Sequence, residues 1–363
     1  MRILHLVNSS DTGGAQTLIE AMASARLDGQ EVHVGVLAAP GALAVRLEAS
    51  ASSVTHFGST GRTSDVVGLV RDVRQLVARL EPDVVHSHLF QANLLAAIAA
   101  PREVAQVWTV HTSGHGARDR LRTRVALSSL DLAVNRADAI VACSETARDW
   151  IARRGWTHER VSTIRNGVTL PATDASNSTS VPQPFFLSLA RAHEMKDHRT
   201  LFSAFALADT PGYELVCAGW NVDAADSLIS TALAGLDDET LRRIRLMGTI
   251  PDPMPLLASA RALVISSSFG EALPMAALEA LALGVPVITT DVGDCGETAV
   301  NSRLLVAPAD PRALAGAMRF VADADTGAYG ELRAAARAVA KRFDVAETVR
   351  SYSDLYEEVL NAV

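Results

Sequence analysis

ALVISSSFGEALPMAALEALALGVPVITT, residues 262–290, joins two short apolar runs through a helical pattern. ALVIS and PVITT are typical of buried strands, and the residues between them suffice for a turn and one helix. Pro274 suits the first helical turn, where its missing N–H costs nothing, and Gly284 suits the far end. The stretch therefore predicts two parallel strands joined by a helix that crosses over the sheet.

Two carboxylates, Glu271 and Glu279, stand in this otherwise small and apolar stretch. If one helix carried both, eight positions would separate them by about 12 Å along its axis and turn them roughly 80° apart. Glutamate is a good helix former and favours a helix N-terminus, so a purely structural role is open for both. The rest of the chain must decide between structure and function.

The same alternation of apolar runs and helical patterns continues along the chain. It predicts two tandem Rossmann-like α/β domains with parallel sheets, at residues 1–168 and 185–344. Residues 169–184, rich in Ser, Thr, Asn and Pro, read as a linker, and residues 345–363 have helical periodicity. The expected strands are RILHLV, EVHVGVL, VTHF, DVVHSH, QVWTV, DAIVAC and VSTI, then FFLSL, YELVCAG, IRLMG, ALVIS, PVITT and RLLVA.

The composition is that of a globular protein, with 363 residues, 48% of them hydrophobic, and a net charge of −8. Residues 1–170 hold 18 arginines against 16 acidic residues, and the remainder holds 15 basic against 25 acidic residues. Without a concentrated basic footprint, we expect no nucleic-acid partner. The densest basic stretch, at 118–124, is either a solvated helix face or a contact for an anionic acceptor or a membrane surface.

The cysteines and the hydropathy of the chain indicate the cellular compartment of the protein. The three cysteines are scattered without disulfide or metal-ligand spacing, as in a reducing environment. MRILHLVNSS has too short an apolar run for a signal peptide, and no run reaches the roughly 18 residues of a membrane helix. We expect a cytoplasmic protein with at most peripheral membrane contact.

Two turns that follow strands carry candidate anion-binding groups. Gly13 and Gly14 allow the backbone to approach a ligand at a helix start, although an ordinary tight turn explains them equally well. Arg191 and Lys196 lie between a strand and a helix, where two cations can neutralise a diphosphate and stabilise its charge as it leaves. Solvation at the surface is the alternative for this pair.

Histidines gather at two strand ends. His111 closes VWTVH, and His115 is close enough in sequence to compete for its role. His86 and His88 alternate along a strand end, so we expect them to point to opposite faces, with structural roles and no metal. A histidine at a strand end is also often only a hydrogen-bonded structural group.

Taken together, these motifs resemble the retaining glycosyltransferases of family 4, which have the two-domain GT-B fold. The matching features extend over nearly the whole chain in the expected order. They are GGAQ, DVVHSH, VWTVH, IRNGV, ARAHEMKDHRTLFSAF and SSSFGEALPMAALEALALGVPVITTDVGDCGE.

The resemblance implies two sheets that face each other across a cleft, with the acceptor bound by residues 1–168 and the nucleotide-sugar donor by residues 185–344. Helix 345–363 would cross back to the first domain. The donor would be a UDP-sugar, with a GDP-sugar as runner-up. The acceptor would be a hydroxyl of a small molecule, natural product, glycolipid or polysaccharide. UDP would be the product, and neither a metal nor a further cofactor is expected.

The same resemblance assigns roles to residues. Glu279 takes the ribose hydroxyls and Glu271 lies at the sugar, so the two glutamates hold opposite ends of one donor. Arg191 and Lys196 hold the diphosphate. His111 lies near the donor sugar and the acceptor. The remaining donor contacts come from backbone groups, at Leu273, Met275 and Ala276 and, from the first domain, at Gly14.

The chain departs from the family pattern at CAGWNVD, where Trp220 and Asn221 replace a glycine-rich turn and leave donor identity open. Asp197 follows Lys196 where the family commonly has glycine. Two other classes stay open. The first is a nicotinamide-dependent oxidoreductase, but this sequence has no G-x-G-x-x-G motif. The second is a non-catalytic two-lobed binding protein, which would not need Arg191, Lys196 and Glu279 together.

Overall fold

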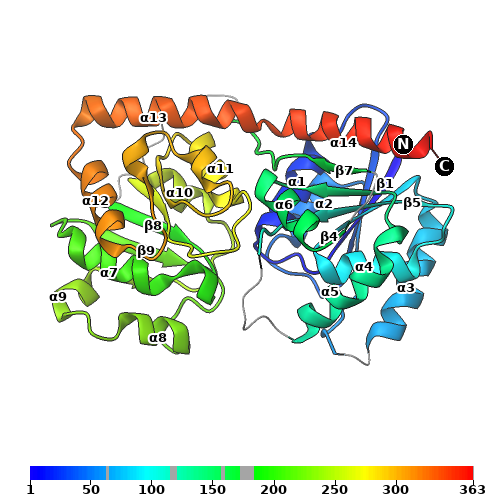
Figure 1. The fold of residues 1–363 in the computed structure, drawn as a ribbon, viewed down its shortest axis with the longest axis horizontal. Helices are drawn as coiled ribbons and strands as arrows, with labels where there is room; N and C mark the ends of the chain where they lie inside the picture. The colour runs from blue at the N-terminus through cyan, green and yellow to red at the C-terminus, as the bar shows by residue number, and fades with distance from the viewer. Residues whose placement is uncertain (63–64, 115–120, 157–159, 172–183, 363) are drawn as a thin grey trace. The chain divides into compact units, whose positions relative to one another are not determined.

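The computed structural model describes residues 1–62, 65–114, 121–156, 160–171 and 184–362, and the side chains of Leu121 and Arg122 lie outside this description. The described chain divides into two compact units. One comprises Met1–Gly167 with Val345–Val363, and the other comprises Val168–Asp344. Each unit has its own parallel sheet with helices packed on it (Figure 1), which confirms the predicted pair of Rossmann-like domains.

The first unit contains a seven-stranded sheet in the order β3-β2-β1-β4-β5-β6-β7, in which every pairing is parallel. Its strands are β1 (Arg2–Val7), β2 (Glu31–Val36), β3 (Ser53–His56), β4 (Val84–His88), β5 (Ala105–Val110), β6 (Ala139–Ala142) and β7 (Val161–Thr163). Its helices are α1 (Gly14–Ser24), α2 (Ala44–Ser50), α3 (Asp65–Leu80), α4 (Phe90–Ala99), α5 (Leu121–Ala133), α6 (Glu145–Arg153) and α14 (Val345–Leu360).

Side-chain alternation along the strands sends two different sets of residues to the two faces of this sheet. Leu4, Leu6 and Val85 join a core cluster with residues of α3 and α4. Val7 joins a second cluster with Ile19 of α1. Helices α1 and α14 contact each other, so α14, although last in the chain, completes the first unit.

The second unit contains a six-stranded sheet in the order β10-β9-β8-β11-β12-β13, again with parallel pairings. Its strands are β8 (Phe185–Leu189), β9 (Glu214–Ala218), β10 (Ile244–Leu246), β11 (Ala262–Ile265), β12 (Val287–Thr290) and β13 (Leu305–Val306). Its helices are α7 (His198–Ala208), α8 (Ser227–Leu233), α9 (Asp238–Arg242), α10 (Met254–Ser259), α11 (Met275–Ala282), α12 (Pro311–Ala322) and α13 (Thr326–Ala340).

The stretch that predicts the fold forms β11, α11 and β12. Pro274 is the N-cap, in extended conformation, and not the first helical residue. Gly284 follows the C-cap with φ +71°, a left-handed conformation that suits glycine. Helix α11 begins four residues after Glu271, so the expectation that one helix carries both glutamates is wrong. Glu271 instead lies in the loop between β11 and the helix.

Candidate functional site

Each sheet has a switch point, where the strand order reverses and ligands of open α/β sheets bind beyond the carboxyl ends of the strands. In the second unit the chain runs from β8 outward to β9 and β10, then returns to β11 on the other side of β8. Lys196 belongs to the loop after β8, and Glu271 belongs to the loop after β11. The predicted residues therefore come together at the carboxyl edge of two neighbouring strands.

An ion pair forms the centre of this edge. The ammonium group of Lys196 donates to Oε1 of Glu271, and the hydroxyl of Ser267 donates to the same oxygen over 2.6 Å. The two charged side chains are 18% and 8% exposed. Burial raises the pKa of Glu271, but Lys196, Ser267 and Arg191 outweigh it, so the net pKa is lowered. Glu271 is therefore a carboxylate at neutral pH.

Backbone contacts hold the two loops together around the ion pair. The hydroxyl of Ser266 donates to the carbonyl of Lys196 over 2.7 Å, and the amide of Ser268 donates to the carbonyl of Met195 over 2.8 Å. Gly293 has φ +61°, and a Cβ there would lie 2.0 Å from the carbonyl oxygen of Glu271. The loop that carries Glu271 is thus positioned from two sides.

Lys196 also depends on the residue that follows it. Asp197 adopts a left-handed conformation with φ 45°, which glycine would adopt without strain. Its side chain accepts from the amide and the hydroxyl of Thr200 and so caps α7. The departure from the family pattern therefore adds a helix cap at this turn.

The other predicted donor contacts lie at the same edge. Met275 and Ala276 are the first two residues of α11, where amides have no intrahelical partner. Leu273 precedes the N-cap, and Glu279 lies partly buried one turn into the helix. Arg191 is exposed in the loop after β8.

Trp220 and Asn221, which distinguish this chain from the family pattern, follow β9 at this edge. The carbonyl of Trp220 accepts from the amide of Ala192 over 2.9 Å, and its side chain is 52% exposed. Asn221 has a left-handed φ of 58°. A Cβ at Gly219 would lie 2.2 Å from the carbonyl oxygen of Ala190, so the loops after β8 and β9 pack backbone to backbone.

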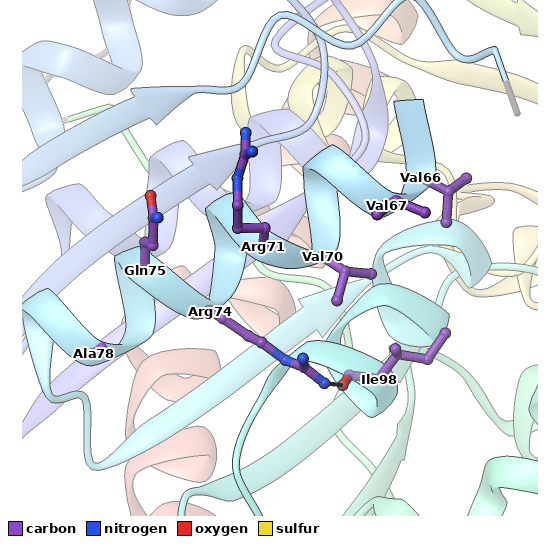
Figure 2. Close-up of a pocket in the computed structure, with 8 residues that line it drawn as sticks. All are labelled: Val66, Val67, Val70, Arg71, Arg74, Gln75, Ala78 and Ile98. Carbon is purple, nitrogen blue, oxygen red and sulfur yellow. Dashed lines mark hydrogen bonds between the residues drawn. The ribbon is translucent and has the colours of Figure 1, made fainter. Parts of the chain in front are cut away.

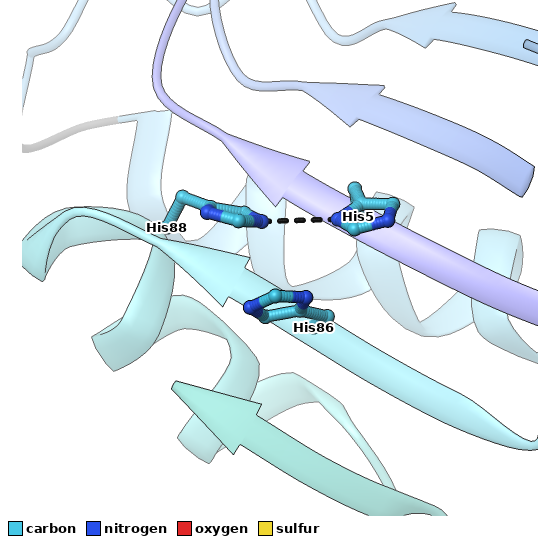
Figure 3. A group of neighbouring side chains, drawn as sticks. All are labelled: His5, His86 and His88. Atoms are coloured by element: carbon cyan, nitrogen blue, oxygen red, sulfur yellow. Dashed lines mark hydrogen bonds between the residues drawn. The ribbon is translucent and has the colours of Figure 1, made fainter. Parts of the chain in front are cut away.

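The first unit has its switch point between β1 and β4. His5 of β1 lies beside His86 of β4 in the sheet register, and His88 follows two residues later on the same face (Figure 3). The expectation that His86 and His88 point to opposite faces is wrong, because residues two apart in a strand share a face. Their rings are 4.1 Å apart between centroids.

Hydrogen bonds join three of these imidazoles in a row. Nδ1 of His5 lies 3.0 Å from Nε2 of His88, and Nδ1 of His88 lies 3.0 Å from Nε2 of His111. His5 and His88 are almost fully buried, and His111, directly after β5, is partly buried. We call His5, His88 and His111 the histidine row.

His86 is held by a separate set of hydroxyls. Its Nδ1 lies 2.6 Å from the hydroxyl of Tyr356, and its Nε2 lies 2.7 Å from that of Thr109. Tyr352 in turn lies 3.1 Å from Thr109. Both tyrosines come from α14, and burial raises the pKa of each.

Burial keeps all four imidazoles uncharged at neutral pH. It lowers the pKa of His5 and of His111 to about 4. Burial, and then the neighbouring imidazoles, lower the pKa of His86 and of His88 well below the ordinary value. One ring nitrogen from each of His5, His86 and His88 lies within 4.8 Å of the others, close enough for metal ligands, but both nitrogens of His86 and His88 already take part in hydrogen bonds.

Gly14, the predicted backbone contact, is the first residue of α1 and is exposed. At the neighbouring Gly13 a Cβ would lie 2.7 Å from Oε1 of Gln16, the end of a flexible side chain. His115, Arg118 and Arg120 lie outside the described residues. Every helix within the described ranges is too short or too polar to span a lipid bilayer.

An open depression of about 510 Å³ on the first unit involves none of these residues. It runs along α3 towards the end of α4, where Arg74 donates to the carbonyl of Ile98 (Figure 2). Its lining is Val66, Val67, Val70, Arg71, Arg74, Gln75, Ala78 and Ile98. Because no carboxylate, imidazole or hydroxyl is among the described residues that line it, we do not assign the chemistry to it.

Sequence reasoning missed four residues that contribute to these sites. A polar His5 inside the apolar run RILHLV was a signal, since a buried polar side chain needs a partner. Ser267 is one of three consecutive serines, and nothing in the sequence distinguishes it. The hydroxyls of Tyr352 and Tyr356 come from the far end of the chain, so only the folded structure brings them to His86.

Known proteins match the chain over both units. The pattern of "Glycosyltransferase Family 4" matches residues 12–170, and that of "Glycosyl transferases group 1" matches residues 183–323. The glycogen synthase of Mycobacterium tuberculosis is 28% identical over 288 residues, which are 76% of this chain and 68% of that protein. The D-inositol 3-phosphate glycosyltransferase of Salinispora tropica is 29% identical over 317 residues, 77% of this chain and 64% of that protein.

Among solved structures, HepE of Anabaena in complex with UDP-glucose superposes with a TM-score of 0.77 and 22% sequence identity, over 100% of both chains. This likeness supports the fold, and the two family patterns cover both halves of the chain in order. The resemblance drawn from the motifs is thereby confirmed. The chain belongs to the glycosyltransferases of family 4, enzymes with the GT-B fold that use a nucleotide-sugar donor.

Proposed function

We propose that the enzyme transfers a hexose from a UDP-sugar to a hydroxyl group, with retention of configuration at the transferred sugar. The observation that supports a diphosphate donor is the Lys196–Glu271 pair at the switch point of the second sheet, with Arg191 on the same loop. The choice of UDP draws on HepE, whose structure contains UDP-glucose.

In this proposal the two glutamates bind opposite ends of the donor. Glu279 accepts from the ribose hydroxyls, and Glu271 lies at the sugar. Lys196 and Arg191, with the amides of Leu273, Met275 and Ala276, bind the diphosphate at the N-terminus of α11. Because Lys196 already neutralises Glu271, an arriving diphosphate must share the ammonium group, which links the phosphate and sugar ends of the site.

The acceptor hydroxyl attacks the anomeric carbon on the face from which the diphosphate departs. The new bond to the acceptor oxygen forms as the bond from carbon to phosphate oxygen breaks, and the acceptor proton passes to the leaving diphosphate. Arg191 and Lys196 stabilise the charge that develops there, so we propose that no metal is needed. We further propose that the imidazole of His111 acts as a hydrogen-bonding group and that the backbone of Gly14 binds ligand.

The acceptor is proposed only as a class. One relative is named for a polysaccharide and another for a phosphorylated polyol. We therefore propose a hydroxyl of a small molecule, natural product, glycolipid or polysaccharide.

The decisive test is calorimetric titration of the full chain with UDP, GDP, ADP and NAD. We expect UDP to bind most tightly, and Glu279→Ala to weaken it by roughly tenfold or more, since hydrogen bonds to charged groups contribute about 1.5–3 kcal/mol. Glu239→Ala is the matched control, because Glu239 is exposed on α9. EDTA should leave binding unchanged.

Each outcome has a defined meaning. Preference for GDP would replace the donor and keep the site. Binding of NAD alone, or of no nucleotide, would overturn the donor assignment and favour the binding-protein alternative. Retention is tested separately, by comparing the anomeric configuration of donor and product by NMR.

A further inference from the structure

The histidine row contains more ring nitrogens than protons, and this constrains each imidazole. Three neutral imidazoles carry three N–H protons between six nitrogens. His88 uses both nitrogens within the row, so it must donate through one and accept through the other. The direction of one hydrogen bond therefore fixes the direction of the next.

Only two arrangements satisfy both bonds. In the first, His5 donates from Nδ1 to His88, His88 donates from Nδ1 to His111, and the third proton lies on Nδ1 of His111. In the second, both bonds are reversed, and the third proton lies on Nε2 of His5. The outer nitrogen of His111 is a donor in the first arrangement and an acceptor in the second.

Burial favours the first arrangement. Within the described part of the chain, no hydrogen bond involves Nε2 of His5, and the His5 residue as a whole is only 2% exposed. An N–H group left without a partner inside a protein is rarer than an acceptor left without one. His111 is partly exposed, so an N–H at its outer nitrogen can meet water or a ligand.

The strand end at His88 is held in an unusual conformation as well. Leu89 follows it with φ 71° and ψ 154°, a left-handed φ that is unfavourable for a bulky residue. Such backbone outliers cluster at functional sites, where the surrounding structure maintains them. The turn places His88 at the end of β4, within hydrogen-bonding distance of both neighbouring strands' histidines.

We propose that His88 is a positioning residue which, bonded to His5 on one side and His111 on the other, fixes His111 as the tautomer with its proton on Nδ1. His111 then presents a permanent hydrogen-bond donor, suited to a sugar hydroxyl or a phosphate oxygen. The effect on transfer rests on the proposed function of His111, whereas the tautomer itself can be measured without any substrate.

The test is nitrogen NMR of the full chain with ¹⁵N-labelled histidine at pH 7.5, with His111 assigned through its loss in His111→Gln. In the wild type we expect Nδ1 of His111 to resonate as protonated and Nε2 as bare. In His88→Phe and in His5→Phe, the two ring-nitrogen signals of His111 should both move towards the values averaged between the two tautomers. The second variant is decisive, because His5 touches His88 and not His111. His5→Gln, whose amide can still donate to His88, should partly restore the tautomer.

His33→Gln is the matched control, because His33 is buried in β2 and bonded to Ser53, outside the row. UDP affinity and circular dichroism report whether each variant remains folded. Averaged signals in the wild type, or signals unchanged by His5→Phe, would overturn the proposal. So would stoichiometric Zn²⁺ that the wild type retains and His88→Phe loses, since a metal would then hold these imidazoles.

Activity gives an independent readout once an acceptor is found. His5→Phe should lower kcat by roughly ten- to a hundredfold, at the low end of the range for a positioned proton donor, with the UDP affinity unchanged. If the nitrogen signals of His111 are as expected but kcat of His5→Phe equals that of the wild type, the assignment of the tautomer is kept and its role in sugar transfer is overturned.

Discussion

The switch point of the first sheet and that of the second occupy the same topological place, but they are built from opposite chemistry. Between β1 and β4 the chain places neutral imidazoles joined by hydrogen bonds. Between β8 and β11 it places a partly buried lysine paired with a buried carboxylate. Most of these polar groups are withdrawn from water, so each needs a partner.

This difference matches the two proposed ligands. A diphosphate brings negative charge, and a preformed cation lowers the cost of receiving it. An acceptor hydroxyl is uncharged, and neutral imidazoles can align it without fixing an ion nearby. Topology thus determines where a ligand binds, and the side chains at the strand ends determine which ligand it is.

The largest expected difference between the two sites is the loss of folding stability as the pH falls. The unfolded chain binds protons on its histidines near pH 6.5, whereas the folded first unit does not protonate His5 or His111 until about pH 4. Stability is therefore lost as pH falls, by about 2 kcal/mol for each such imidazole between pH 6.5 and 5.

The second unit shares this response through His198, whose pKa burial lowers to about 4. Glu271, whose pKa is lowered, adds a loss that begins only below pH 4.5. Hydrogen exchange at pH 7, 6 and 5, corrected for intrinsic rates, should show β1 and β4 losing protection before β8 and β11. Simultaneous loss would contradict the comparison.

The next largest effect should come from removing the positive charge of Lys196. Lys196→Met removes the cation that pairs with the buried carboxylate of Glu271, and we expect a loss of about 3–5 kcal/mol in the free energy of unfolding together with the loss of UDP binding. Adding Glu271→Gln should recover much of the stability and none of the binding. Lys341→Met is the control, since Lys341 is exposed. Thermal and urea unfolding measure each variant, and equal losses for the two lysines would argue against a buried pair.

A smaller effect should come from the backbone that supports Glu271. Gly293→Ala combines a left-handed φ of 61° with a Cβ only 2.0 Å from the carbonyl oxygen of Glu271, which we expect to cost about 2–3 kcal/mol. Gly248→Ala is matched, because its φ is 62° and nothing lies within 4 Å of the added Cβ. It should cost about 1 kcal/mol. Urea unfolding that gives the same loss for both variants would mean that the loop gives way without strain.

The smallest effect concerns the cap beside Lys196. Asp197→Ala removes the bonds to Thr200 and leaves a non-glycine residue in a left-handed conformation, at a cost of about 1–2 kcal/mol. Asp197→Gly loses the same bonds without strain and should cost only a few tenths of a kcal/mol. Melting temperatures of the two variants decide this. A larger loss for glycine would mean that backbone entropy outweighs conformational strain at this turn.

The fold could be predicted because strands and helices repeat local patterns in the chain. Alternating β-branched runs and helical stretches indicated both sheets. Pro274 lies one residue before its predicted place in the first helical turn, because its ψ of 124° is extended and the helix begins only at Met275.

The sites were only partly predictable, since they depend on which strands are neighbours. Lys196 and Glu271 were both identified, but their direct contact requires β8 to lie beside β11, a pairing that no local pattern encodes. The histidine row requires three strands in one order and one face. His86 and His88 could have been placed correctly from strand periodicity alone.

Helix α14 has a consequence for biosynthesis. The second unit is one continuous stretch, Val168–Asp344, whereas the first is assembled from residues 1–167 and 345–363. During translation the second unit can complete its core as it leaves the ribosome. The hydroxyls of Tyr352 and Tyr356 that His86 and Thr109 require arrive only afterwards. The half of the enzyme that is synthesised first is therefore the half that finishes folding last, and a chain that ended before residue 345 would contain all of the second unit but only part of the first.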